Sequence, residues 1–170
     1  MNIQKVSMLG TVLIGIILHL LIFFFACYQF IDIPFGMGEK LVETRRIARQ
    51  ISDSIILLGA PAVTLVIAAL YTILHSMKSP LTIKSGALGS VISSFLAQFG
   101  MVVLFGCFPM TLSINYMHYR TPAEGELDRL LQVPFNSTVF EFATFIITIP
   151  LAAITGAIFS SIIIRKRKAY

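Results

Sequence analysis

Long stretches without a charged side chain dominate the chain. Asp, Glu, Lys and Arg are absent from four windows of 26, 24, 35 and 23 residues, which cover 6–31, 54–77, 85–119 and 142–164. A helix needs about 20 mainly apolar residues to cross a bilayer core of about 30 Å. Each window is long enough for one crossing, and the third is too short for two crossings with a loop. The pattern predicts four membrane-spanning helices, over about 7–31, 54–77, 87–110 and 139–164.

Composition agrees with this pattern. Hydrophobic residues make up 56% of the 170 residues and charged residues 12%, whereas a soluble domain has roughly 25% charged residues. This excludes an ordinary soluble enzyme and a disordered tail. The apolar run after Lys5 exceeds the roughly 7–15 residues of a signal-peptide core, so we expect a retained first helix. We therefore predict an all-α integral membrane protein, a four-transmembrane-helix bundle that forms a single membrane domain over 1–170.

The basic residues predict the orientation. Four crossings place both termini and the second loop on one side of the membrane. That side carries seven bases and no acid, namely Lys5, Lys78, Lys84, Arg165, Lys166, Arg167 and Lys168. Bases close to short loops face the cytoplasm, so we expect cytoplasmic N- and C-termini. The net charge of +5 is then explained by membrane anchoring, with lipid headgroups as partners and no nucleic acid.

The compartment is an expectation of the same kind. We expect a bacterial cytoplasmic membrane. The alternative is the endoplasmic reticulum, because Lys166 and Lys168 resemble a dilysine retrieval tail near the C-terminus.

Two amphipathic segments are predicted in the outer loops. From Glu39 a helical pattern runs into the second span, with Ile47, Ile51, Ile55 and Leu58 on one face. Three arginines lie on another face: Arg45, Arg46 and Arg49. They form either a solvated surface or a cluster that binds a partner's acidic surface or a lipid phosphate.

The second outer loop also contains a helix signal. Thr121-Pro122-Ala123-Glu124 is typical of a helix start, and an apolar stripe of Leu127, Leu130 and Leu131 follows it. This predicts a short helix that lies on the outer leaflet.

Small residues mark the predicted helix contacts. The third span carries Gly86, Ser90, Ser93, Ala97 and Gly100 in steps of three and four, and the fourth carries Ala152, Gly156 and Ser160 in steps of four. Small residues allow helix backbones to approach closely within a membrane. We expect these two spans to pack on each other, or one of them to pack on a partner subunit.

Four polar or helix-breaking residues fall within the spans. His19 lies near the centre of the first span, where an ionisable group is a functional candidate; the alternative is a neutral imidazole that binds Gln98 or a serine. Pro61 and Pro150 each remove a backbone hydrogen bond and predict a kink. The kinks suit either static packing or a transport pathway.

The two cysteines, Cys27 and Cys107, are predicted near the outer ends of their spans. They are either buried thiols or a structural disulfide. The sequence has no recognisable catalytic motif, paired haem histidines or metal-ligand spacing, so we expect no catalytic residues, no metal and no cofactor.

Three classes of function follow from these patterns. The first is a non-enzymatic polytopic membrane subunit that packs in or stabilises a larger complex, with other membrane protein subunits as partners. The second is a homo-oligomeric channel or small transporter, with His19, Gln98, Pro61 and Pro150 near its pathway. The third is a lipid-modifying membrane enzyme that uses Glu141, His118 and the three loop arginines.

Overall fold

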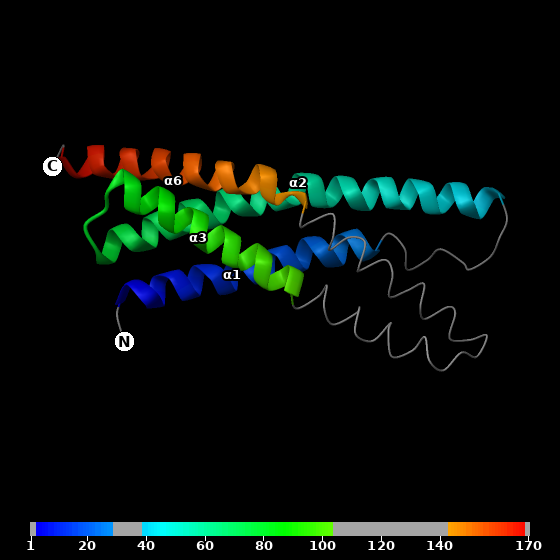
Figure 1. Ribbon diagram of the computed structural model, residues 1–170, viewed down its shortest axis with the longest axis horizontal. Helices are drawn as coiled ribbons and strands as arrows, with labels where there is room; N and C mark the ends of the chain where they lie inside the picture. Colours follow the sequence, from blue (N-terminus) through cyan, green and yellow to red (C-terminus); the bar gives the residue numbers. More distant parts are fainter. Residues whose placement is uncertain (1–2, 29–38, 104–142, 169–170) are drawn as a thin grey trace.

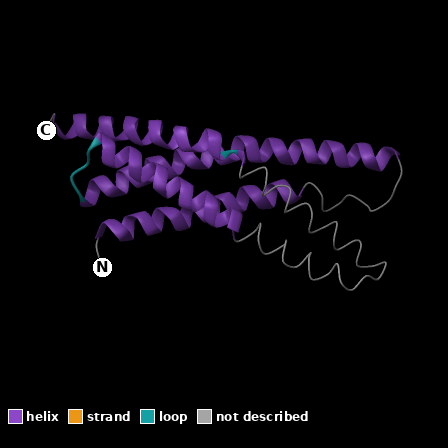
Figure 2. Cartoon of the chain, in the orientation of Figure 1, coloured by secondary structure: helices purple, strands orange, loops and turns teal. Residues whose placement is uncertain are grey.

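The computed structural model describes residues 3–28, 39–103 and 143–168, and these residues form four long helices (Figure 1). Helix α1 covers Ile3–Tyr28, α2 covers Glu39–Lys78, α3 covers Ile83–Val102 and α6 covers Phe145–Lys168. The regular elements of the described residues are all helices, as Figure 2 shows.

Each helix contains a segment that is long and apolar enough to cross a membrane. These segments are Met8–Ala26, Arg46–Lys78, Ile83–Val102 and Phe145–Lys168. Their outward side chains are largely apolar; Ile146, for example, is 82% exposed within the isolated chain. Such a surface suits contact with acyl chains. The prediction of an all-α bundle of four membrane-spanning helices is confirmed, whereas the predicted outer helix near 121–131 lies outside the described residues.

The helices surround a shared core. Helix α1 contacts α2 and α3, α6 contacts α2 and α3, and α2 also contacts α3. In the part of the chain that the structure describes, α1 and α6 do not touch, so they lie on opposite sides of the α2–α3 pair. Buried Val63, Ile67 and Ala97 form the apolar centre, against which residues of α1 pack.

The turn between α2 and α3 has a clear local cause. Pro80 lies two residues after Lys78, the last residue of α2, and its ring cannot continue the helix. Thr82 then caps α3: its hydroxyl oxygen accepts from the Ser85 backbone N–H at 3.0 Å, and the Ser85 hydroxyl oxygen accepts from the Thr82 N–H at 3.0 Å. This capping box satisfies two helix-end donors and begins α3 before the predicted span. The two termini lie at the same end of the bundle as this turn (Figure 1).

Helix α2 is much longer than its neighbours. It contains 40 residues, against 20 in α3. Both α2 and α6 continue as helices through their prolines, Pro61 and Pro150. The N-terminal part of α2 therefore extends past the described end of α1 (Figure 1).

Candidate functional site

The polar and small residues inside the bundle are the first candidate site, and α3 meets α6 along them. A Cβ added to Gly156 would lie 2.5 Å from Ser90 Oγ and 2.6 Å from the Gly86 carbonyl oxygen. A Cβ added to Gly86 would overlap the Ser160 hydroxyl. The two backbones approach each other so closely that only glycine fits at both positions. Gly86 and Ser90 of α3 thus lie against Gly156 and Ser160 of α6 within one chain, whereas Ala97 and Gly100, which the sequence assigns to the same small face of α3, lie against α1.

Ser90 lies where three helices meet. Its hydroxyl donates to the Ala68 carbonyl of α2 at 3.2 Å and lies 3.4 Å from Thr72 Oγ1. The same side chain faces Gly156 of α6. One buried hydroxyl therefore joins α3 to α2 at the level where α6 packs most closely.

Gln98 joins α3 to the start of α6. Its Nε2 donates to Thr144 Oγ1 at 2.7 Å, and its Oε1 accepts from the Thr148 hydroxyl at 2.8 Å. Gln98 is buried, as are both threonines. The Gln98 amide thus donates to one hydroxyl and accepts from another one helical turn away. We call this arrangement of Gln98, Thr144 and Thr148 the Gln98 clasp.

Several other buried hydroxyls bind their own helix. Thr64 donates to the Ala60 carbonyl at 2.9 Å, Thr72 to the Ala68 carbonyl at 2.7 Å, and Ser160 donates to the carbonyl of Gly156 at 2.6 Å. Such bonds satisfy a hydroxyl where no water is available. Within the described residues, the buried hydroxyls of Ser52, Ser93 and Ser94 have no hydrogen-bond partner.

His19 of α1 is fully buried in the bundle. One turn earlier, a Cβ on Gly15 would lie 2.6 Å from both Ala97 Cβ and Ile67 Cδ1, so α1 presses closely on α2 and α3 there. Gly100 is also near α1, since its Cβ would lie 3.1 Å from Ile16 Cδ1. His19 therefore lies in a tightly packed interface between α1 and its neighbours.

A second histidine, His75, is buried in the last turn of α2. The His75 ring stacks on Tyr71, with centroids 5.4 Å apart and an interplanar angle of 13°. A Cβ on Gly89 of α3 would overlap the Tyr71 ring. The tyrosine therefore needs this glycine in order to lie between α2 and α3.

The end of the bundle that holds the termini is basic. The side chains of α6 at this end are exposed, namely Arg165, Lys166, Arg167 and Lys168. Arg167 also reaches α2, where its Nη2 donates to the Ser76 carbonyl. Lys78 and Lys84 are exposed on either side of the α2–α3 turn.

Charges on the other end are partly paired. Arg46 Nε donates to Glu43 Oε2 at 2.8 Å, and Arg46 Nη2 donates to Glu43 Oε1 at 2.6 Å. These hydrogen bonds lower the pKa of Glu43, with the positive charge of Arg46 acting in the same direction. Arg45 and Arg49 belong to the same helix, and the positions of their side chains lie outside the structural description.

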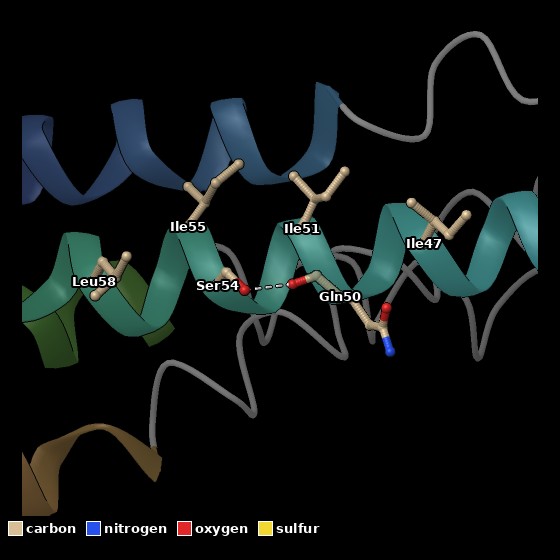
Figure 3. A pocket seen from close by; sticks show the side chains of 6 residues that line it. All are labelled: Ile47, Gln50, Ile51, Ser54, Ile55 and Leu58. Carbon is tan, nitrogen blue, oxygen red and sulfur yellow. Dashed lines mark hydrogen bonds between the residues drawn. The ribbon is translucent and has the colours of Figure 1, made fainter.

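An open apolar hollow of about 310 Å³ lies further along the same helix (Figure 3). It is lined by Ile47, Gln50, Ile51, Ser54, Ile55 and Leu58. The Ser54 hydroxyl donates to the Gln50 carbonyl at 2.7 Å, and the Gln50 side chain is the other polar group among the described residues of the lining. The hollow follows the isoleucine face that the sequence predicts for this segment.

The remaining predicted positions are not brought together by the described structure. Cys27 belongs to α1, but its side chain lies outside the description, as do Cys107, His118 and Glu141. Ala152 is buried on α6, and Ser93 and Ala97 are buried on α3. Within the described residues, no three His, Cys, Asp or Glu side chains form a group that could hold a metal ion.

Sequence reasoning missed the partners of Gln98. Thr144 and Thr148 lie four residues apart, which places them on one helix face, and this spacing was the available signal. Gly15 and Gly89 were missed as well, because an isolated glycine does not reveal which large side chain it will face.

No protein-family model matches the chain, and no curated protein or solved structure matches it either.

Proposed function

We propose that the chain is a non-enzymatic membrane subunit that stabilises a larger membrane protein complex through α2. The observation that carries the proposal is the length of α2. Its 40 residues correspond to about 60 Å of helix, twice the roughly 30 Å of a bilayer core. A helix that only crossed the membrane would need about half of them.

The basic end of the bundle allows the membrane level to be estimated. Lys78 ends α2 at that end, and about 20 residues cross the core. Counting back along α2 places the opposite boundary near Leu58. The hollow between Ile47 and Leu58 then lies at and beyond this boundary, and the exposed Glu43–Arg46 pair lies further from the membrane on the same helix.

The hollow suits an apolar segment of a second membrane protein. Ile47 is 46% exposed, Ile51 43% and Leu58 73%. Apolar surface at the edge of the membrane meets water and headgroups, and its removal from water is favourable. Gly86 and Ser90 of α3 face Gly156 and Ser160 of α6, so these small residues are already in contact within the chain. Among the described residues, the exposed isoleucines of the α2 extension offer a partner an apolar surface at the edge of the membrane.

The interior supports the same role. Gln98 and Ser90 bind neighbouring helices, and hydrogen bonds of this kind hold membrane helices together. In this proposal the buried polar groups hold a rigid frame together, and α2 extends from that frame to the partner.

The test is capture of the intact protein from native membranes in mild detergent, followed by the mass of the intact complex. We expect a second membrane protein in fixed ratio with the wild type, and its loss in the Ile47→Ser/Ile51→Ser variant. Ile154→Ser/Ile158→Ser is the matched control, because it makes the same change at the same spacing on an exposed face of α6. That control should retain the partner.

Two results would contradict the proposal. One is equal loss of the partner in both variants. The other is a homo-oligomer with no second protein, which would favour the channel; ion flux in liposomes, with Gln98→Leu as the variant, would then be measured.

A further inference from the structure

The end of the bundle opposite the hollow gathers bases from three helices. Lys78 ends α2, Lys84 lies in the first turn of α3, and the last turn of α6 contains Arg165, Lys166, Arg167 and Lys168. All six side chains are exposed. We call these six residues the basic rim. Figure 1 shows the end of α6 and the α2–α3 turn at the same end of the molecule.

No acid of the described helices compensates this charge. The sequence has no Asp or Glu between Asp53 and Glu124, and none after Glu141. Asp53 lies in the N-terminal half of α2, many turns before Lys78. The basic rim is therefore a surface of one sign, and it attracts anions.

Exposed apolar side chains directly border the basic rim. Met77 is 75% exposed beside Lys78, and Ile83 is half exposed beside Lys84. On α6, Ile162 is exposed just before Arg165. On each of the three helices, the bases are thus accompanied by an exposed apolar side chain suited to an acyl chain. A phospholipid carries both an anionic headgroup and acyl chains, whereas a soluble anion carries only the first.

Arg167 gives the basic rim a defined geometry. Its guanidinium donates to the Ser76 carbonyl near the end of α2, which fastens the last turn of α6 to α2. Arginine has five donors in a planar fork, so one bond to Ser76 leaves others for a phosphate. This contact fixes the bases of α6 at the same end of the bundle as Lys78 of α2.

We propose that the basic rim binds the headgroup phosphate of anionic phospholipids in the leaflet at this end, with acyl chains against Met77, Ile83 and Ile162. Bases near an anionic membrane surface each strengthen binding, and basic surfaces between membrane helices bind anionic headgroups. This proposal is independent of the proposed function, which concerns the opposite end of α2.

The experiment uses the purified full chain in detergent, titrated with phosphatidylglycerol or phosphatidylcholine, with bound lipid counted by intact mass. We expect phosphatidylglycerol to be retained over phosphatidylcholine. The variant Lys78→Gln/Lys84→Gln/Lys166→Gln/Lys168→Gln should lose this retention by about tenfold or more. Because these four lysines are exposed and Arg167 is kept, the variant should fold normally, which its thermal midpoint checks.

Two controls complete the test. Arg46→Gln removes a base from the other end and should leave lipid retention unchanged. Glycerol phosphate, the soluble headgroup, should not displace the lipid. Equal retention by wild type and the lysine variant would overturn the proposal, and so would displacement by glycerol phosphate at the concentration at which phosphatidylglycerol itself competes.

Discussion

At the scale of single residues, Gln98 illustrates how one polar side chain can hold two membrane helices together. Its amide binds the hydroxyls of Thr144 and Thr148 at 2.7 and 2.8 Å. An amide without hydrogen-bond partners has a high free energy in lipid. The Gln98 side chain therefore opposes insertion of α3 on its own but favours the association of α3 with α6, where the amide finds both partners.

Replacement of Gln98 by Leu should weaken the α3–α6 interface. It removes two interhelical hydrogen bonds, and such bonds contribute about 0.6 kcal/mol each on average, so the loss is about 1 kcal/mol. The free energy of unfolding in bicelles, measured by steric trapping, checks this value.

Gln50→Leu is the matched control, because it makes the same chemical change on the exposed face of α2. It should leave the free energy of unfolding nearly unchanged. If both variants have equal stability, the Gln98 clasp does not hold the two helices together.

Gly156 makes a second prediction at this scale. In Gly156→Ala the new methyl group meets Ser90 and the Gly86 backbone at 2.5–2.6 Å, and backbone cannot turn aside as a flexible side chain can. We expect a loss of about 1–3 kcal/mol, typical of overpacking. Gly10→Ala is the control, since nothing lies within 4 Å of a Cβ there. Thermal melting in detergent compares the two, and an unchanged melting temperature for Gly156→Ala would contradict the close contact.

The sequence indicates some of these residues but not their neighbours. Steps of three and four place Gly86 and Ser90 on one face of α3. The same steps cannot show that Ser90 binds a carbonyl of α2 while Gly86 faces α6. A helical pattern gives the face of one helix, whereas the partner depends on how the whole bundle assembles.

At the scale of elements, α2 differs most from a simple membrane crossing. The isoleucine spacing after Glu39 predicts a helix that continues into the second span, and α2 is a single helix over Glu39–Lys78. The beginning of α3 is less predictable. The charge-free window begins after Lys84, whereas the Thr82–Ser85 capping box starts the helix at Ile83, before that lysine. Charge patterns locate the apolar core of a span, and local capping sets its ends.

The continuity of α2 through Pro61 is directly measurable. Spin labels at Thr44→Cys and Met77→Cys, in a background with Cys27→Ser and Cys107→Ser, lie on either side of the proline. A continuous helix places the two backbone positions about 50 Å apart, which electron–electron double resonance can measure. A distance below about 40 Å would show that the helix is sharply bent or broken.

At the scale of the whole molecule, the two ends have different chemistry. One end carries the termini, the α2–α3 turn and the basic rim, and the other carries the α2 extension with its apolar hollow (Figure 1). The charge-free windows predict the four helices, but they do not predict which helices touch, since every span of similar hydropathy could pack beside any other.

The measurement that tests the four-span architecture most directly is cysteine labelling in sealed membrane vesicles of one orientation. Pro80→Cys, Lys168→Cys and Thr44→Cys are introduced singly into the variant without native cysteines and treated with a membrane-impermeant maleimide. With four crossings, we expect Pro80→Cys and Lys168→Cys to react from the same side, the cytoplasmic one, and Thr44→Cys to react only from the opposite side. Labelling of Pro80→Cys and Lys168→Cys from opposite sides, or of Thr44→Cys from the side of Pro80→Cys, would contradict a bundle with four crossings.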